Sequence, residues 1–199
     1  AVHGVMAKDV TVFPHAIGLA ATWNTELLFK IATAVSDEAR ALYKPDGSNN
    51  GAGWGGLTYW SPMINIARDP RWGRTQESYG EDPYLTGRLG IAFVRGLQGD
   101  NPKYLKVVAT PKHFAANNEE YRRHRGSSDV PEQVLQEYYL PHFKACITEG
   151  KAYSIMGAYN ALNGTDEFEI YKEDEKLSVK ENIKIESIDS ENIKYGYCT

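Results

Sequence analysis

Apolar residues recur at helical spacing in three segments of the chain. Residues 24–43 carry them at Leu27, Leu28, Ile31, Val35, Ala39 and Leu42, with Asn24 or Thr25 able to cap the start. Residues 83–98 form a second such segment, with Asp82 as N-cap, Pro83 in the first turn and a glycine beyond the end. Residues 131–150 form a third, which Pro141 should interrupt or kink. The pattern predicts three helices.

Three short apolar runs rich in β-forming residues lie between these segments and after the last of them. They cover residues 57–61, 105–110 and 153–158, and a Gly/Asn-rich stretch, residues 44–56, precedes the first as an expected exposed loop. The resulting order of helix, strand, helix, strand, helix, strand favours parallel βα units. An antiparallel sheet joining the three strands would contradict this prediction.

Polar residues follow the end of each predicted strand. A charged motif containing Arg74 follows the first strand, Lys112 and His113 the second, and Tyr159 the third. In parallel α/β folds such strand ends face one side of the sheet, where reactive residues gather. We therefore expect Arg74, Lys112, His113 and Tyr159 to converge on one pocket.

The charged motif reads "INIARDPRWGRTQESYGEDPYLTG", residues 64–87. Arg68, Asp69 and Arg71 are predicted to form ion pairs that brace the loop, since such arginines often pair structurally. Glu77 is predicted to orient Arg74 rather than to act as an acid. The charged residues of the motif are thus predicted to hold hydrogen-bond donors, such as Arg74, in fixed positions next to a buried strand.

Composition narrows the function classes. The chain has 199 residues and a net charge of −4, so it lacks the net positive charge typical of nucleic-acid-binding proteins. No apolar run approaches the ~20 residues of a membrane span. Cys146 and Cys198 are too few for a disulfide framework, and no Cys/His cluster indicates a metal site. Thirteen tyrosines and four tryptophans could cover the apolar faces of sugars, although aromatic residues also simply fill cores.

Residues 165–199 differ from the rest in composition. They contain no proline and one glycine, and are rich in Glu, Lys, Asn and Ile. This shift near Gly164 predicts a domain boundary. Residues 165–199 are then an unassigned tail, for which an origin in another segment or domain stays open.

Three strings together resemble the first domain of glycoside hydrolase family 3: "LTYWSPMINIARDPRWGRTQESYGEDPYLTG", "VVATPKHFA" and "SIMGAYNALNG". The resemblance spans residues 1–164. It implies an α/β fold, part of a (β/α)8 TIM-type barrel with a divergent C-terminal tail. It also implies a retaining hydrolase that releases terminal β-D-glucosyl or β-D-xylosyl residues from oligosaccharides or aryl β-glycosides, needs no cofactor, and is secreted or periplasmic rather than cytoplasmic.

In that family an aspartate attacks the anomeric carbon and a glutamate serves as acid and base. The aspartate belongs to a Ser-Asp-Trp or Ser-Asp-Cys motif, which does not occur after Gly164 in this chain, and "VSDE" and "SSDV" lie too early. Asp189 follows a β-like run, but its neighbours do not match. The catalytic residues therefore stay unknown, and the chain is expected to be a fragment that needs the remainder of a parent enzyme.

The resemblance also implies substrate-binding roles for individual residues of this chain. Arg74 resembles the family arginine that donates to sugar hydroxyls, Lys112 and His113 resemble its Lys-His pair, and Tyr159 resembles the tyrosine beside the nucleophile. Two alternatives stay open. One is a non-catalytic sugar-binding remnant of such a barrel. The other is a phosphate-binding barrel using Lys112 and Arg74, which lacks the support of a glycine-rich phosphate loop. Glucoside and xyloside preference cannot be separated.

Overall fold

The computed structural model of the protein describes residues 3–44, 56–164, 170–173 and 176–179. Most of the loop predicted at 44–56 and most of the tail, including Asp189, lie outside the described residues. The tail contributes one described feature. Strands β7 (Ile170–Glu173) and β8 (Lys176–Val179) pair antiparallel.

Two of the predicted helices form as expected, after a short helix α1 (Ala16–Ala20) that was not predicted. Helix α2 (Thr25–Leu42) begins after Asn24, whose side chain accepts a hydrogen bond of 2.9 Å from the Leu27 amide. Helix α3 (Pro83–Gln98) begins after Asp82, which accepts from the Leu85 amide at 2.6 Å. These side chains satisfy amides that have no partner within the helix, as the sequence indicated.

The third predicted helix is divided. It consists of α4 (Glu132–Val134), a π-helical segment η2 (Leu135–Tyr139) and α5 (Pro141–Thr148). Pro141 lacks an amide hydrogen and occupies the first turn of α5, so it starts a new helix instead of continuing the old one. The predicted interruption at Pro141 is confirmed.

The three predicted strands exist as short parallel strands. Strand β1 (Thr58–Tyr59) pairs with β2 (Val108–Ala109), and β3 (Lys112–Phe114) pairs with β5 (Met156–Gly157). A parallel bridge between Met63 and Lys112 continues the pairing of β1 with β2. The segment that contains β2 and β3 therefore runs between the segment of β1 and the segment of β5. The parallel α/β arrangement is confirmed. A further parallel pair, β4 (Ser127–Ser128) with β6 (Ala161–Leu162), was not predicted.

One boundary was wrong. Lys112 and His113 were expected beyond the end of a strand that stops at residue 110, but both lie within β3. The Lys112 amide donates to the Pro62 carbonyl at 3.0 Å, and the Ile64 amide donates to the Lys112 carbonyl at 2.8 Å. Pro111 therefore removes one donor from the ladder without ending it, and its own carbonyl accepts from the Met156 amide at 3.0 Å.

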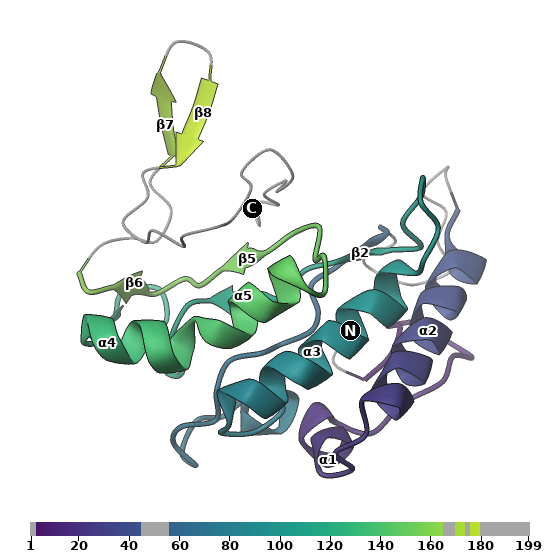
Figure 1. The fold of residues 1–199 in the computed structure, drawn as a ribbon, viewed down its shortest axis with the longest axis horizontal. Coiled ribbons are helices and arrows are strands. Elements are labelled where there is room, and N and C mark those ends of the chain that lie inside the picture. The colour runs from purple at the N-terminus through teal and green to yellow at the C-terminus, as the bar shows by residue number, and fades with distance from the viewer. Residues whose placement is uncertain (1–2, 45–55, 165–169, 174–175, 180–199) are drawn as a thin grey trace.

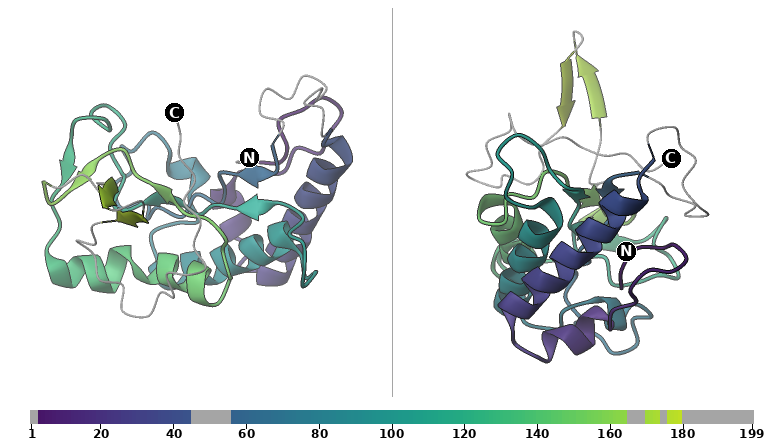
Figure 2. Two further views of the ribbon diagram at one scale, coloured as in Figure 1. Left: turned by 90° about the horizontal axis from the view of Figure 1, so that it is seen from above. Right: turned by 90° about the vertical axis from the view of Figure 1, so that its right-hand side faces the viewer.

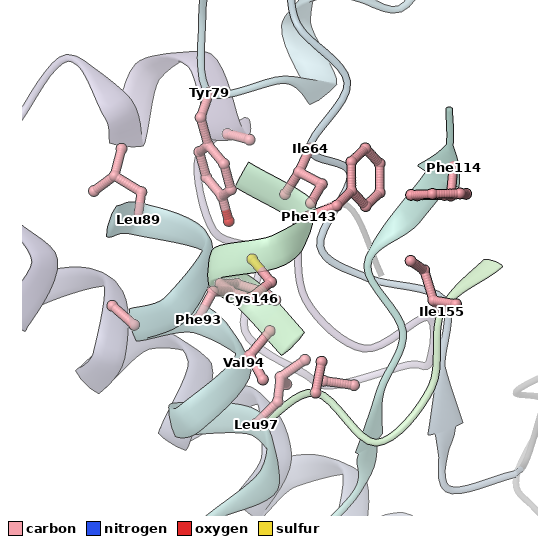
Figure 3. Close-up of a cluster of buried hydrophobic side chains, with 14 of the residues drawn as sticks. Ile64, Tyr79, Leu89, Phe93, Val94, Leu97, Phe114, Phe143, Cys146 and Ile155 are labelled. Carbon is pink, nitrogen blue, oxygen red and sulfur yellow. The ribbon is translucent and has the colours of Figure 1, made fainter. Parts of the chain in front are cut away.

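Helices and strands form separate layers (Figures 1 and 2). Helix α3 packs between α2 and α5, and the three helices lie side by side along one face of the strands. The core fills the space between α3, α5 and the strands (Figure 3). In it Phe114 from β3 meets Phe143 from α5 edge-on, with ring centroids 5.1 Å apart. This packing fixes β3, and with it His113, against the helical layer.

Glycine lets α3 approach α2 closely. A Cβ placed on Gly96 would lie 2.5 Å from the Phe29 carbonyl oxygen and 2.7 Å from the Ala32 Cβ. We expect Gly96→Ala to lower the free energy of unfolding by about 1–3 kcal/mol, because the two backbones must separate. Urea denaturation measures this. The matched control is Gly18→Ala in α1, where a Cβ would meet no atom within 4 Å, so stability should stay equal or rise slightly. Equal losses in both variants would contradict the packing argument.

Candidate functional site: an arginine held between a glutamate and a histidine

The charged motif forms a loop that leaves the strand region at Ile66 and returns before α3. The Ala67 amide donates to the Gly80 carbonyl at 2.9 Å, which closes the loop at its base. A short 3-10 helix, η1 (Thr75–Glu77), turns Glu77 back toward Arg74. The loop geometry thus brings the guanidinium of Arg74 into contact with the carboxylate of Glu77, three residues later in the chain.

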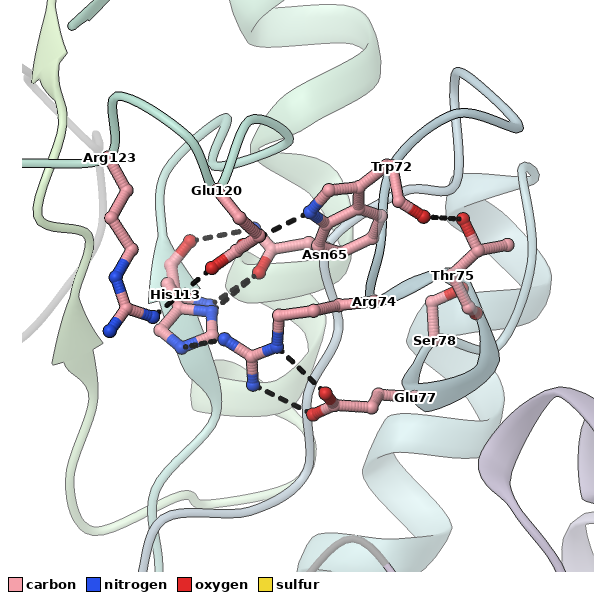
Figure 4. A network of polar contacts seen from close by, with 9 residues as sticks. All are labelled: Asn65, Trp72, Arg74, Thr75, Glu77, Ser78, His113, Glu120 and Arg123. Carbon is pink, nitrogen blue, oxygen red and sulfur yellow. Dashed lines mark hydrogen bonds and ion pairs between the residues drawn. The ribbon is translucent and has the colours of Figure 1, made fainter.

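Arg74 is held by Glu77 through one edge of its guanidinium. Its Nε donates to Glu77 Oε1 at 2.8 Å and its Nη2 donates to Glu77 Oε2 at 2.7 Å (Figure 4). The exposed fractions of the two side chains are 19% and 15%. Burial alone would raise the pKa of Glu77, but the hydrogen bonds and charge of Arg74, with a further contribution from Lys112, outweigh it and lower that pKa. Glu77 is therefore ionised, as a residue that orients Arg74 must be.

The other arginines of the motif have structural contacts. Arg71 pairs with Asp69 at 2.6 Å on the surface, and this pairing, led by the side-chain hydrogen bond, lowers the pKa of Asp69. Arg68 instead donates to the Tyr139 hydroxyl at 2.6 Å and lies over that ring. The predicted loop-bracing role is confirmed for Arg71 and Asp69. For Arg68 the expected ion pair is replaced by a contact with an aromatic residue of η2.

His113 lies almost entirely buried, with 3% of its surface exposed. Its Nδ1 is 2.9 Å from Asn65 Oδ1, and its Nε2 is 3.3 Å from Arg74 Nη1 (Figure 4). Burial, then the charges of Lys112, Arg74 and Arg123, lower the pKa of His113 to about 2. The imidazole is therefore neutral at physiological pH, and it contacts Arg74 without charge repulsion.

A second network joins the motif to the loop after β3. The Trp72 indole Nε1 donates to Glu120 Oε1 at 3.1 Å, and Arg123 Nη1 donates to Glu120 Oε2 at 3.1 Å. The Arg123 guanidinium carbon lies 5.2 Å from the centre of the Tyr159 ring. The His124 ring also lies 4.6 Å from the Tyr159 ring. Glu120 thus connects Trp72 to the residues that surround Tyr159, which is 38% exposed.

Lys112 shares a pocket with Glu77. The pocket is lined by Ala16, Leu19, Trp60, Ser61, Pro62, Met63, Glu77, Tyr79, Phe93 and Lys112. The charge of Lys112 acts on both Glu77 and His113. Lys112 therefore influences the protonation of the two residues that contact Arg74.

Of the four predicted binding residues, the structure brings Arg74 and His113 into direct contact. Lys112 adjoins His113 in β3, and Tyr159 is linked to the group through Arg123 and by its influence on the pKa of Arg74. Sequence reasoning missed Asn65, Glu120 and Arg123. Asn65 had one available signal, a polar residue between Ile64 and Ile66 in a buried run. The charged string "NNEEYRRHR" around the other two carried no distinguishing pattern.

No helix within the described ranges is long and apolar enough to cross a membrane. Over the same ranges, no group of three or more His, Cys, Asp or Glu residues is placed to hold a metal ion.

Comparison with known proteins decides the family. The model of the glycosyl hydrolase family 3 N-terminal domain matches residues 1–176. The chain belongs to glycoside hydrolase family 3. The match runs beyond Gly164, where the composition changes.

Among curated relatives, this family 3 chain is 42% identical over 170 residues to the xylan 1,4-β-xylosidase of Xylanibacter ruminicola, covering 82% of the chain and 20% of that protein. It is 46% identical over 159 residues to β-D-xylosidase 1 of Arabidopsis thaliana, covering 77% of the chain and 20% of that protein. The family 3 chain therefore spans about a fifth of the length of these relatives.

Two solved structures are similar in fold and in sequence. A family 3 exo-β-xylosidase in complex with a xylobiose aziridine activity-based probe superimposes with a TM-score of 0.73 at 37% identity, over 83% of this chain and 22% of the other. The family 3 β-glucosidase of Bifidobacterium adolescentis gives a TM-score of 0.69 at 33% identity, over 82% and 22%. Both sugar types thus occur among close structural neighbours.

Proposed function

We propose that this family 3 chain forms part of the sugar-binding subsite of a retaining β-glycosidase. The observation that carries the proposal is the guanidinium of Arg74. Within the described residues three of its five N–H groups donate, two to Glu77 and one to His113, which leaves one N–H on each terminal nitrogen. Two parallel donors on a rigid plane suit two adjacent hydroxyl oxygens of a sugar ring.

Three neighbouring residues support the same role. Lys112 adds a cation with three N–H groups, His113 a neutral imidazole, and Tyr159 a partly exposed ring that can cover an apolar sugar face. In the proposed reaction these residues bind and orient the non-reducing sugar. The chain's own residues supply no identified nucleophile or general acid, so the covalent steps belong to an aspartate and a glutamate outside the described site.

We further propose that the parallel βα units are part of a (β/α)8 barrel whose strand ends form the mouth of this subsite. Three parallel strand segments support this: β3 contains Lys112 and His113, and Arg74 and Tyr159 come after β1 and β5. Residues 1–164 would make up the barrel segment, with the tail as a separate unit.

For the sugar itself, we propose β-D-xylose before β-D-glucose. The support is that the curated relatives in the comparison are named as β-xylosidases and that one of the most similar structures holds a xylobiose-derived probe. The β-glucosidase neighbours make glucose the second candidate.

The test uses two proteins. The 199-residue chain alone should not hydrolyse an aryl β-xyloside or β-glucoside measurably, because acid–base assistance alone is worth roughly 10²–10⁴ in rate and no nucleophile is identified. A graft in which residues 3–164 replace the matching segment of the Xylanibacter ruminicola β-xylosidase should hydrolyse the aryl β-xyloside with retention of configuration, visible by NMR of the first-formed sugar.

Two results would contradict the proposal. One is a folded graft, judged by circular dichroism against the parent enzyme, without hydrolysis. It would favour the non-catalytic sugar-binding remnant, especially if the chain alone still binds xylose in an NMR titration. The other is robust hydrolysis by the chain alone, which would direct the search for a nucleophile to the tail and to Asp189.

A further inference from the structure

A buried asparagine outside the predicted site contacts its central histidine. Asn65 follows Ile64, is 2% exposed, and makes three hydrogen bonds to His113 (Figure 4). The His113 amide donates to Asn65 Oδ1 at 2.8 Å, Asn65 Nδ2 donates to the His113 carbonyl at 2.8 Å, and His113 Nδ1 lies 2.9 Å from the same Oδ1. One side chain thus binds the backbone and the ring of one partner.

The two backbone contacts fix the orientation of the Asn65 amide. A backbone N–H can only donate and a carbonyl can only accept, so Oδ1 must face the amide and Nδ2 the carbonyl. Oδ1 has a second lone pair, and it points to the imidazole Nδ1 at 2.9 Å. An oxygen that cannot donate requires a proton on Nδ1. In a neutral ring Nε2 is then an acceptor.

The far side of the imidazole agrees with this assignment. Nε2 lies 3.3 Å from Arg74 Nη1, and a guanidinium can only donate. With the opposite tautomer, an N–H would face the arginine N–H and a bare nitrogen would face the asparagine oxygen. Both contacts would be repulsive, and one of them involves groups that are fully buried.

We propose that Asn65 is a positioning residue of the sugar subsite: it holds His113 as the Nδ1–H tautomer, so that Nε2 accepts from Arg74 or from a substrate hydroxyl. This proposal rests on the proposed function for its link to sugar binding, but the tautomer itself does not. The order of contacts is Asn65, His113, Arg74 and Glu77. Each hydrogen-bonds to the next, which fixes the plane of the guanidinium that we propose binds the sugar.

The charges around His113 favour the neutral ring. Lys112 from β3, Arg74 from the charged motif and Arg123 from the loop after β3 all act against a proton on the imidazole. The acids in this region are engaged with arginines, Glu77 with Arg74 and Glu120 with Arg123. Asn65 supplies an oxygen acceptor to Nδ1 without adding a negative charge, which would stabilise an imidazolium.

The deciding experiment is a ¹⁵N NMR titration of the 199-residue chain labelled at histidine, with the five histidines assigned by comparison with His113→Gln. We expect the His113 Nδ1 to be protonated and Nε2 to be bare, without change from pH 8 to pH 4. An Nε2–H tautomer, or protonation near the ordinary histidine pKa, would overturn the proposal. Five histidines titrating together would also overturn it, because the network would then not form in the chain.

Asn65→Asp tests the positioning role itself. A carboxylate beside Nδ1 should raise the pKa of His113, so that its protonation begins at a higher pH than in the wild type when the same titration is extended to pH 3. The matched control is Asn118→Asp, which changes an amide that donates to the Ile66 carbonyl at 2.7 Å and leaves His113 without a new contact. An unchanged His113 in Asn65→Asp would overturn the proposal. Should that variant fail to fold, the wild-type spectrum decides alone.

In the active graft, kcat/KM of Asn65→Asp should rise as pH increases through the raised pKa, since the deprotonated ring regains its acceptor. A loss of equal size at every pH would mean that Asn65 is only structural. The two proposals fail separately. An inactive graft with the Nδ1–H tautomer contradicts the glycosidase function alone, and an active graft with the Nε2–H tautomer contradicts the role of Asn65 alone.

Discussion

Replacing Arg74 by lysine should lower kcat/KM for an aryl β-xyloside in the active graft by about 10²- to 10³-fold, the loss typical of removing one positioned donor from an active site. A guanidinium reaches Glu77 with two N–H groups, His113 with a third, and still presents two more. An ammonium has three N–H groups and no fixed plane. It cannot keep both neighbours and bind two hydroxyls. Steady-state kinetics at several pH values measure the loss.

The control for this variant lies three residues earlier in the same loop. Arg71→Lys makes the same substitution at a side chain that is 89% exposed and paired with Asp69. Exposed ion pairs contribute little, so kcat/KM should change less than about twofold. Comparable losses in both variants would mean that the loop depends on its arginines in general, and that Arg74 has no special part in binding.

Glu77→Gln should lower kcat/KM by about 10- to 100-fold, because the charged hydrogen bonds to Arg74 are worth about 1.5–3 kcal/mol and every 1.4 kcal/mol is tenfold. The shape of the pH profile should stay unchanged. A general acid must carry a proton at the working pH, and Glu77 has a lowered pKa that keeps it ionised. The profile thus separates an orienting residue from an acid.

Glu81→Gln is the matched control, since Glu81 is exposed in the same motif and contacts Tyr138 only through its backbone carbonyl in the described structure. Its kinetics should equal those of the unchanged graft. Loss of the basic limb of the profile in Glu77→Gln would reassign Glu77 as the proton donor, because that limb reports deprotonation of the general acid. An unchanged kcat/KM would remove its orienting role.

Local chemistry made the helices predictable. Asn24 and Asp82 cap α2 and α3 with contacts only three residues long, and Pro141 divides the last helix because it has no amide hydrogen. The Arg74–Glu77 pair is similarly local, being closed by a single 3-10 turn. Such features depend on neighbours in the chain, and a sequence displays its neighbours directly.

The strands were less accurately predicted. The run that was expected to end at residue 110 continues through Pro111 into β3. Whether a proline ends a strand depends on which rung of the ladder it occupies, and the partner strand sets that rung. The partner here is the segment around Pro62 and Met63, about fifty residues away in the chain.

The sequence by itself determined the parallel α/β class, the ends of α2 and α3, the family, and the choice of Arg74, Lys112, His113 and Tyr159 as candidate binding residues. Only the tertiary structure decided how they work. The contacts of His113 with Asn65 and of Trp72 with Glu120 each join residues 48 positions apart, and a pattern of neighbouring residues carries no information about distant partners. The protonation of His113 also depends on burial and on charges from three segments, which exist only once the chain has folded.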